Sequence, residues 1–584
     1  MKNFMIPVLL FLFINSFIIY SAGDSSGYKR TKWFYSQRYA PYDTISENFM
    51  QNALTERDYI RSGGYYMNPA AGTWENLSGF TGRINTVKYA GNNIFVIGAP
   101  NGGIWKKSGT VWTYMDPNGY LKSNTSGAIG VDNSTEPPTI YYGTGEGIYG
   151  FVYAYLGNGI YKTTNWGDSW SHISNGLGSN MQIFRITIRP NYPSHVFAAT
   201  SKGLFRSTNS GNNWSVVSGT SGLHCNDIVF SSQNEYKAFM TGPKSDDLLF
   251  PGVGFRTSTD GGETFTVYTG DDFQPIGRTH IAVYENDDDY IYAITQDGII
   301  SVFVSTNGGE SFHGPYNCNT SSQGGYNMLL NISLDDPSII YVGGIDLFKS
   351  TDYGVTFNEI GASMHDDFHH MAINPDNYNE IAVVNDGGIY FSLNNGVSWS
   401  NANTGLPLMN TYRMINPGYR IVAGNQDNGF VRRETSNFEI GMWAFGDGTN
   451  VINSKIQPNI VIGITGNTPG SIHLSTNGGI DRNSLIDLPG KWDGGNDWLG
   501  AICEHPVDAG YFYTARRNAA GNNINIWRST NYGLNWATIG NGVSALKSPQ
   551  NIVFSTKDPD IVYMSTSGYS GPYWYEQYFG RGFF

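Results

Sequence analysis

Hydrophobic and polar positions alternate along this chain in short runs that repeat. One apolar run, FRITIRP at 184–190, precedes a polar or proline turn, and the run after such a turn ends in small residues, as in DDPSIIYVGG at 335–344. A third run leads into a glycine-containing turn, and a fourth short run follows it. Apolar alternation bounded by turn residues is typical of β-strands. Four strands in each ~40–50 residues predict the blade of a β-propeller.

The turn between the third and fourth predicted strands has nearly the same sequence each time, and we call it the box turn. Its core is Ser/Thr-x-Asp/Asn-x-Gly-x-x-Trp/Phe, and its central glycines from 167 to 396 recur at intervals of 42 to 51 residues. GGIWKKSGTVW at 102–112 is a degenerate first copy. The other copies are GIYKTTNWGDSW (159–170), GLFRSTNSGNNW (203–214), GFRTSTDGGETF (254–265), VFVSTNGGESF (302–312), LFKSTDYGVTF (347–357), IYFSLNNGVSW (389–399), IHLSTNGGI (472–480) and IWRSTNYGLNW (526–536).

The chemistry of the box turn is that of a hairpin connection. Its Asp or Asn can accept backbone N–H groups within the turn, and its glycine supplies a positive φ that other residues resist. The trailing Trp or Phe begins the next strand and packs over the turn. We therefore predict structural roles, without catalysis, for Asn165, Asn209, Asp260, Asn307, Asp352, Asn394, Asn477 and Asn531.

These turns resemble the Asp-box repeat, also called the bacterial neuraminidase (BNR) repeat. Their frequency of one per blade is similar to that of the sortilin-type propeller and of the xyloglucanase family of tandem propellers. The resemblance covers about residues 74–575 and implies an all-β fold of about eleven four-stranded blades, arranged as two stacked propellers or one large ring. The units begin near Arg83, Gly127, Phe184, Cys225, Thr279, Leu329, His370, Tyr412, Val451, Leu499 and Gln550.

The two ends of the chain predict its processing and its domain organisation. Residues 1–22 carry one early lysine, a long apolar run and small residues at the end, which is the pattern of a cleaved signal peptide. An uncleaved membrane anchor is the alternative. We expect residues 23–73 to form an extension, partly helical around 45–60, followed by a first propeller part at 74–400. A second part at 401–584 ends inside a blade, so we expect its C-terminus to be cut short. The protein is then secreted or held at the cell surface, with no membrane contact after cleavage.

Composition narrows the function classes. Charged residues make up 14% of the chain and aromatic residues 15%, and 73 of the 584 residues are glycine. This mixture excludes a coiled coil and a globally disordered chain. The formal net charge of −13 argues against nucleic acid as a partner, because phosphate binding needs a basic surface.

The cysteines do not form a recognisable framework. The chain has three of them, Cys225, Cys318 and Cys503, far apart in the sequence and without zinc-site spacing. They permit one disulfide at most, and three buried thiols are equally compatible with the sequence.

One histidine-rich loop is a candidate ligand-binding site. HDDFHH at 365–370 contains His365, Asp367 and His369, together with Asp366 and His370. Imidazoles and carboxylates at this spacing can bind a divalent metal or transfer protons. The alternative is a polar lead-in to the strand HMAINP, with side chains that hydrogen-bond to neighbouring blades.

A second set of candidates consists of carboxylates beside glycines at strand ends. Paired carboxylates are what glycoside hydrolysis requires, and nearby tryptophans can stack on sugar rings. Ordinary Asp-Gly turns and satisfied polar groups of a propeller channel are the alternative. The catalytic candidates are Glu146, Asp386, Asp427 and Asp447, joined by Asp493 and Asp497, and the candidate sugar-stacking residues are Trp443, Trp492 and Trp498.

Two positions depart from the enzyme families that the repeats resemble. The resemblance to the xyloglucanase family implies a catalytic aspartate before the Gly-Gly of the first blade, where this chain has Asn101 in APNGGIW. Sialidases carry Arg-Ile-Pro near their start, where this chain has Arg83, Ile84 and Asn85. An amide cannot act as a carboxylate base, so these departures favour a binding role over hydrolysis.

We expect no cofactor other than possible calcium, with Asp287 and Asp289 as candidate oxygen ligands beside Asp288, Asp271 and Asp272. The favoured function is a secreted propeller that binds protein or polysaccharide. The alternatives are a secreted glycoside hydrolase of xyloglucanase or sialidase type and an assembly or export factor. The oligomeric state stays open.

Overall fold

The computed structural model describes residues 81–147, 155–247, 251–323, 325–416, 420–433, 438–443, 446–466, 471–486, 488, 500–517, 523–544, 547–555 and 557–570. The predicted signal peptide at 1–22 and the extension at 23–73 lie outside these residues. The described part of the chain contains strands and no helix, and none of it forms a helical segment with the length and apolar character of a membrane span.

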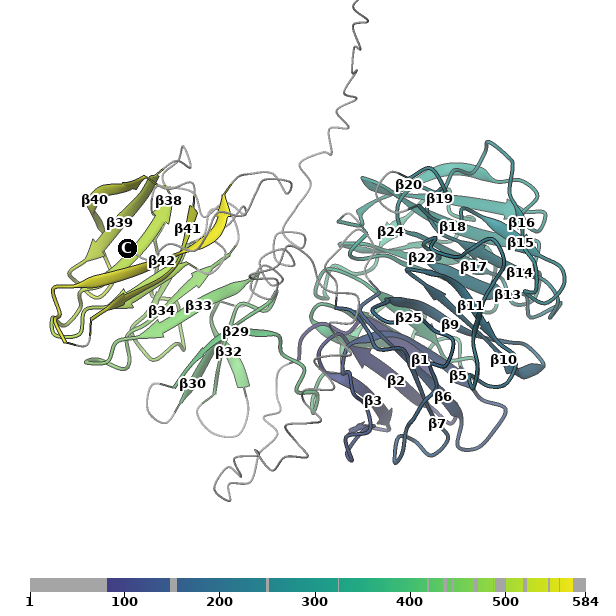
Figure 1. Cartoon of the computed structure of the whole chain (residues 1–584), viewed down its shortest axis with the longest axis horizontal. Helices are drawn as coiled ribbons and strands as arrows, with labels where there is room; N and C mark the ends of the chain where they lie inside the picture. Colours follow the sequence, from purple (N-terminus) through teal and green to yellow (C-terminus); the bar gives the residue numbers. More distant parts are fainter. Residues whose placement is uncertain are drawn as a thin grey trace, which may run out of the picture.

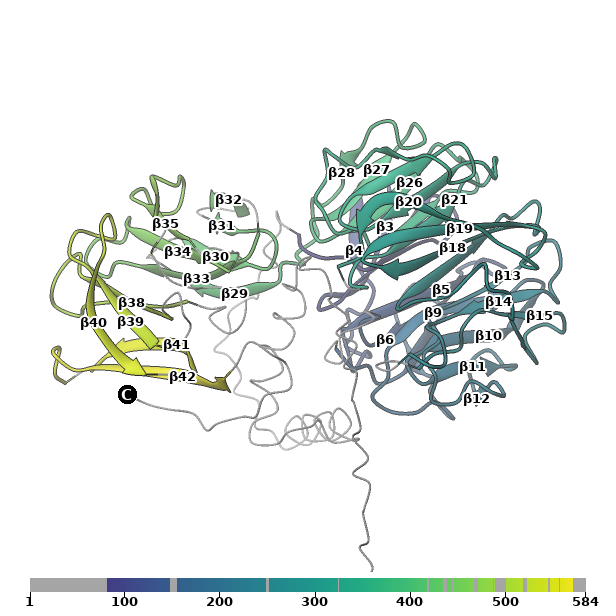
Figure 2. The same ribbon diagram turned by 90° about the horizontal axis from the view of Figure 1, so that it is seen from above.

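The described strands form ten four-stranded antiparallel sheets and one two-stranded sheet, each built from consecutive strands. This confirms the predicted all-β propeller fold. The sheets fall into two sets that stand side by side (Figures 1 and 2). The strands of the first set are β1 (Thr86–Tyr89), β2 (Ile94–Ala99), β3 (Gly103–Ser108), β4 (Val111–Tyr114), β5 (Ser126–Asp132), β6 (Thr139–Thr144), β7 (Ile160–Thr163), β8 (Ser171–His172), β9 (Ile183–Arg189), β10 (Tyr192–Thr200), β11 (Gly203–Ser207), β12 (Ser215–Val216), β13 (Asp227–Phe230), β14 (Ala238–Thr241), β15 (Arg256–Ser258), β16 (Thr266–Val267), β17 (Thr279–Val283), β18 (Tyr290–Asp297), β19 (Ile299–Thr306), β20 (His313–Ser321), β21 (Leu329–Ile332), β22 (Ile340–Gly343), β23 (Leu347–Ser350), β24 (Asn358–Glu359), β25 (His370–Ile373), β26 (Ile381–Asn385), β27 (Gly388–Ser392) and β28 (Ser400–Asn401).

The first set is a closed ring of seven blades. The first strand of each blade contacts the first strand of the next, from β1 through β5, β9, β13, β17 and β21 to β25, and β25 returns to β1. Among the described strands, none is exchanged between the first and last blades, because each sheet of the ring is made of four consecutive strands. The ring therefore closes by packing of side chains and by bonds between blades.

The second set consists of three four-stranded sheets and one two-stranded sheet, in which β29 contacts β33, β33 contacts β37, and β37 contacts β41. Its strands are β29 (Thr411–Ile415), β30 (Ile421–Asn425), β31 (Phe430–Arg433), β32 (Phe438–Trp443), β33 (Gly448–Asn453), β34 (Val461–Thr465), β35 (Ile472–Ser475), β36 (Ser484–Ile486), β37 (Ala501–Glu504), β38 (Phe512–Arg517), β39 (Asn523–Ser529), β40 (Ala537–Ser544), β41 (Lys547–Phe554) and β42 (Val562–Ser570).

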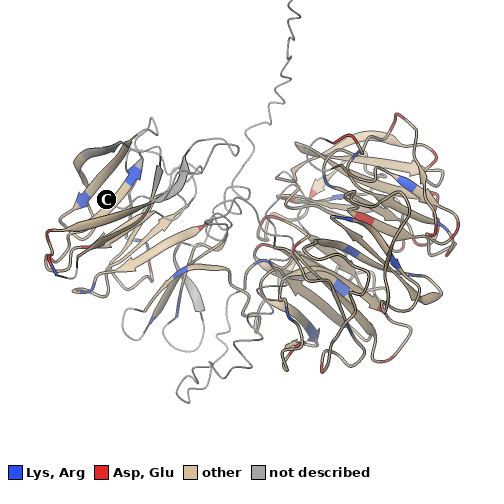
Figure 3. Ribbon diagram, viewed as in Figure 1, with Lys and Arg blue, Asp and Glu red and all other residues tan. Residues whose placement is uncertain are grey.

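Burial is greatest in the second strand of a blade and least in the fourth strand at its rim. The second strands β14, β22 and β26 are buried at every position, whereas the fourth strands β8, β12 and β28 are exposed at both of theirs. Strands packed on both faces must be apolar nearly throughout, because each face meets the next sheet. This accounts for the low charge content, and Figure 3 shows how sparse charged residues are along the strands.

All eight box turns use one hydrogen-bond pattern. In the copy at 347–357, the Ser350 hydroxyl donates to Asp352 Oδ1 at 2.8 Å and accepts the Gly354 amide at 2.9 Å. The Asp352 carboxylate accepts the Thr356 amide at 2.8 Å. Tyr353 and Gly354 have φ values of 62° and 85°, in the left-handed region that glycine adopts without strain. The carboxylate or amide of the box is therefore occupied by the turn itself.

The aromatic residue of the box turn also joins neighbouring blades. Trp170 Nε1 donates to the carbonyl of Met115 in the preceding blade, and Trp214 Nε1 donates to that of Ile173, both at 2.7 Å. Trp112, from the degenerate first copy, donates at 2.8 Å to the carbonyl of Ala402, which follows the seventh blade. The same bond that joins consecutive blades thus closes the ring across 290 residues.

Replacement of Trp112 tests this closure. Trp112→Phe keeps most of the apolar surface of the side chain but leaves the Ala402 carbonyl without its donor. We therefore expect a loss of about 1–3 kcal/mol in the free energy of unfolding. Urea unfolding measures it, with Val111→Ala, an exposed neighbour, as the control. Hydrogen exchange should also speed up at the Ile84 amide, which donates to the Asn385 carbonyl across the closure. An unchanged midpoint together with unchanged exchange would show that Trp112 does not hold the ring closed.

Candidate functional site

Antiparallel topology separates the candidate residues from the box turns. In a blade of four consecutive antiparallel strands, the connection between strands 2 and 3 and the connection to the next blade leave at one end. The connections between strands 1 and 2 and between strands 3 and 4 leave at the other end. Box turns lie at the second end. At the first end lie Glu146 (after β6), Asp386 (after β26), Asp427 (after β30), Asp447 (before β33) and the 365–370 loop (before β25).

Three of these loops, together with Tyr326 from the segment before β21, supply a buried network that Arg83 holds together. Arg83 Nη2 lies 2.5 Å from Glu146 Oε1, and Arg83 Nη1 donates to the Tyr326 hydroxyl at 2.5 Å. The Tyr326 hydroxyl donates to Asp386 Oδ2 at 2.5 Å. His369 Nε2 lies 2.6 Å from Asp386 Oδ1. Residues 243 positions apart in the sequence therefore share one chain of bonds.

Backbone geometry positions Glu146 for this pairing. Gly145 has a φ of 90°, and a Cβ at this position would lie 2.5 Å from the Met181 carbonyl of the adjacent blade. Only glycine fits both constraints. The Glu146 amide donates to the Tyr155 carbonyl at 2.7 Å, which fixes the loop after β6 and turns the carboxylate toward Arg83.

Charge pairing overcomes the cost of burial in this network. The exposed fractions of Arg83, Glu146 and Asp386 are 7%, 3% and 0%. Burial alone would lower the pKa of Arg83, but the negative charge of Glu146 and its other partners hold that pKa well above its usual value. Burial likewise opposes ionisation of Asp386, yet the hydrogen bond from His369 and the charge of Arg83 hold its pKa well below the usual range.

Asp427 extends the network from the ring to the second set of sheets. A side-chain hydrogen bond from Asp427 contributes to the lowered pKa of Asp386. Asn428 Nδ2 donates to the Asp386 carbonyl at 3.1 Å. The Asp427 amide donates to Asp447 Oδ1 at 3.0 Å, and the Tyr412 hydroxyl donates to the same oxygen at 3.3 Å. Three of the four predicted carboxylates thus meet where the two sets of sheets touch, and Arg83 brings the fourth, Glu146, beside Asp386.

This geometry differs from that of a glycosidase pair. A glycosidase needs two carboxyl groups that both reach the substrate, roughly 5–5.5 Å apart in retaining enzymes and roughly 6.5–9.5 Å apart in inverting ones. Here Glu146 and Asp386 are buried. Glu146 is paired with Arg83, and Asp386 is bonded to Tyr326 and His369. The carboxylates therefore neutralise the buried Arg83, and the bond from Asn428 to the Asp386 carbonyl joins the ring to the second set of sheets.

The side chains of the 365–370 loop diverge. His365 Nε2 lies 3.0 Å from the Asp427 carbonyl, and Asp367 Oδ1 accepts Asn327 Nδ2 at 2.5 Å. His369 pairs with Asp386, and His370 Nε2 accepts from Arg185 Nη1 at 3.2 Å. Among the described residues, no group of three or more His, Cys, Asp or Glu side chains is placed to hold a metal ion.

The remaining candidates lie elsewhere. Trp492, Trp498, Asp493 and Asp497 fall outside the described residues, as does the side chain of Trp443. Asp287 and Asp289 lie between β17 and β18, at the box-turn end of their blade, where Asp287 Oδ1 accepts the Asp289 amide at 3.1 Å. Calcium binding there stays a prediction. Cys225, Cys318 and Cys503 are free thiols, and burial raises the pKa of Cys503 to about 12.

Asn101 lies at the same end of its blade as the network but at the surface. Its Nδ2 donates to the Tyr155 hydroxyl at 3.2 Å and to Asn410 Oδ1 at 3.3 Å. Asn410 immediately precedes β29, so this cluster also lies where the ring meets the second set. Asn101 is exposed and Tyr155 and Asn410 are half-buried, and all three carry neutral donors and acceptors. Sequence analysis missed Tyr155, Asn410 and Tyr326 because none of them stands in a repeated motif.

Solved structures with the same architecture include two enzymes. The chain resembles a GH74 enzyme of Niastella koreensis with a TM-score of 0.57 and 15% identity, over 84% of this chain and 79% of that one. It resembles a GH74 xyloglucanase of Xanthomonas campestris with a TM-score of 0.56 and 15% identity, over 84% and 85%. No protein-family model matches the chain, and no curated protein matches it significantly. At this identity the likeness establishes the β-propeller fold.

Removing the Arg83 charge tests the network. Arg83→Met leaves Glu146 and Asp386 as buried charges without their partner, so we expect a loss of about 3–5 kcal/mol in the free energy of unfolding. Arg413→Met, at an exposed position of β29, is the matched control. If Arg83→Met unfolds with the control's midpoint, the network does not stabilise the fold.

The pH dependence of stability provides a second test. The folded pKa of Asp386 is depressed below the unfolded value of about 3.9, so its stabilising contribution is complete above that value and is lost as the pH falls below it. When urea unfolding is measured between pH 6 and 2.5, the wild-type urea midpoint should decrease once the pH is below about 4. Asp386→Asn should make this decrease smaller. Asp271→Asn, at an exposed position, should leave it unchanged. A decline equally steep in Asp386→Asn would assign the acid sensitivity to other groups.

Proposed function

We propose that this protein is a carbohydrate-binding β-propeller that holds a neutral polysaccharide without hydrolysing it. The observation that carries the proposal is the division of polar groups at the loop end of the blades. The carboxylates Glu146 and Asp386 are buried and paired. The exposed Asn101, by contrast, bonds to the half-buried Tyr155 and Asn410, and all three side chains are neutral. Amide and hydroxyl groups match the donors and acceptors of sugar hydroxyls without a charge to desolvate.

The place of Asn101 supports binding rather than catalysis. An acid–base pair for glycoside hydrolysis needs two carboxyl groups that reach the substrate. An amide at position 101 supplies no such group, and Asp386 is fully buried. The likeness in fold to a xyloglucanase makes a β-linked glucan, such as xyloglucan, the first ligand to test. The predicted signal peptide at 1–22 supports action at the cell surface or outside the cell.

Binding and hydrolysis can be measured on the same protein. We expect xyloglucan or mixed-linkage β-glucan to retard the purified protein in affinity electrophoresis, with release of reducing sugar below ordinary enzymatic rates of about 1 s⁻¹. Asn101→Ala and Asn410→Ala should each weaken binding about 2- to 10-fold, since each removes groups that can bond to sugar hydroxyls. Asn212→Ala, exposed in a box turn at the opposite end, is the matched control.

The outcomes separate the proposals. Sugar release at an enzymatic rate that Asp427→Asn abolishes would replace the binding function by a glycoside hydrolase. If Asn101→Ala and Asn212→Ala both bind the glycans as tightly as the wild type, the binding site lies away from the Asn101 cluster. Failure of a panel of neutral glycans to bind would overturn the carbohydrate function.

A further inference from the structure

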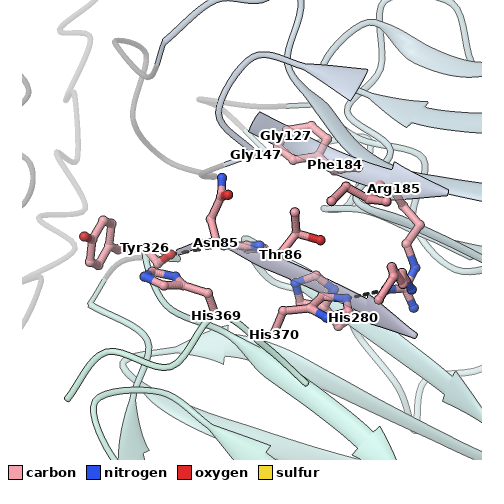
Figure 4. Close-up of a pocket in the computed structure, with 14 residues that line it drawn as sticks. Asn85, Thr86, Gly127, Gly147, Phe184, Arg185, His280, Tyr326, His369 and His370 are labelled. Atoms are coloured by element: carbon pink, nitrogen blue, oxygen red, sulfur yellow. Dashed lines mark hydrogen bonds between the residues drawn. The ribbon is translucent and has the colours of Figure 1, made fainter. Parts of the chain in front are cut away.

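The channel of the seven-bladed ring contains a cavity with an unusual charge balance. Innermost strands of several blades line it, and Figure 4 shows Arg185, His280 and His370 side by side within it. Its basic lining residues are Lys88 from β1, Arg185 from β9, Arg278 and His280 from the start of β17, and His370 from β25. None of the described residues that line it is Asp or Glu.

One carboxylate beside the cavity partly offsets this charge. Asp227 Oδ1 lies 2.9 Å from Arg185 Nε, and Asp227 Oδ2 lies 3.2 Å from His280 Nδ1. Asp386, the other nearby acid, is engaged by His369, Tyr326 and Arg83 in the network described above. Three cationic side chains therefore face one carboxylate.

The titration behaviour of the lining groups reflects the excess of positive charge. Burial and then repulsion by Arg185 lower the pKa of Lys88 to about 7. Burial lowers the pKa of His280 to about 4, and burial together with Lys88 and Arg185 lowers that of His370 well below its usual value. Burial also lowers the pKa of Arg278 to about 10. Each group holds its proton less firmly than it would beside a counter-ion.

Hydrogen-bond donors in the cavity lack acceptors. His370 Nε2 accepts from Arg185, so the neutral ring carries its hydrogen on Nδ1, and this nitrogen is buried without a partner among the described residues. Arg278 Nη1 donates to the carbonyls of Gly325 and Tyr326, but its Nε–H has no partner. Unsatisfied buried donors are costly, and native proteins satisfy them with water or a ligand.

We propose that the channel of the ring binds a small monovalent anion of halide size, held by Lys88, Arg278 and His370. The cavity volume of about 30 Å³ sets the size of the ligand. A buried water needs roughly 10–15 Å³, so the cavity accepts a halide or a few waters and excludes a sugar ring. The anion supplies the missing negative charge and accepts the free N–H groups.

Bromide reports on this site directly. Protein dialysed into sodium gluconate, crystallised and soaked in sodium bromide should show an anomalous scattering peak inside the cavity, within contact of Lys88 and Arg278. Bromide peaks confined to the outer surface, with water alone in the cavity, would overturn the proposal. This measurement uses the wild-type protein and does not depend on the folding of a variant.

Stability in solution provides the second measurement. At constant ionic strength, replacing gluconate by chloride should raise the unfolding midpoint until the site saturates, because a ligand that binds only the folded state stabilises it. Lys88→Met should weaken binding and so raise the half-saturating chloride concentration at least about 10-fold. Lys557→Met, at an exposed position, should leave this concentration unchanged. Half-saturation should also require less chloride at pH 6 than at pH 8, since Lys88 is then fully charged. Equal chloride responses of both variants would show that the effect is not due to the channel.

Discussion

Closure of the first seven blades into a ring is the constraint on which the rest of this structure depends. β1 packs against β25, and Trp112 donates to the Ala402 carbonyl as Trp170 and Trp214 donate to their preceding blades. Because no described strand is exchanged, side-chain packing and hydrogen bonds such as these, together with the Ile84–Asn385 backbone bond, hold the first and last blades together. They bring Arg83, which precedes β1, beside Asp386, which follows β26, and they enclose the channel that the innermost strands line.

The enclosed channel holds two polar regions with different charge balances. In the first, the charge of Arg83 is matched by Glu146 and Asp386, and His369 and Tyr326 bond to the two carboxylate oxygens of Asp386. In the second, Lys88, Arg185 and Arg278 face one carboxylate, Asp227. Buried charges are tolerated when they are paired and hydrogen-bonded. In the first region protein groups supply the balancing charge, although the Arg83 Nε–H has no partner among the described residues. In the second region the proposed anion supplies the missing negative charge.

The sequence predicted the blades closely, because each blade repeats a local signal. Expected unit starts near Gly127, Thr279 and Leu329 fall within one residue of strands β5, β17 and β21. Alternation and the box turn depend on neighbours in the chain, so they can be read without tertiary information. The candidate site was predictable only in part. Glu146, Asp386, Asp427 and Asp447 stood out beside their glycines, but their partners Arg83 and Tyr326 carry no motif that links them.

The sequence by itself determined the blade, its four strands, its box turn and the residues at its loop end, since all of these follow from spacing within about 50 residues. Tertiary structure alone decided how many blades close, which carboxylates are buried and which polar groups stay at the surface. Ring closure sets these outcomes, because it brings residues up to 303 positions apart, such as Arg83 and Asp386, into one electrostatic network. Pairing across such separations depends on the geometry of the whole ring, and no local pattern encodes it.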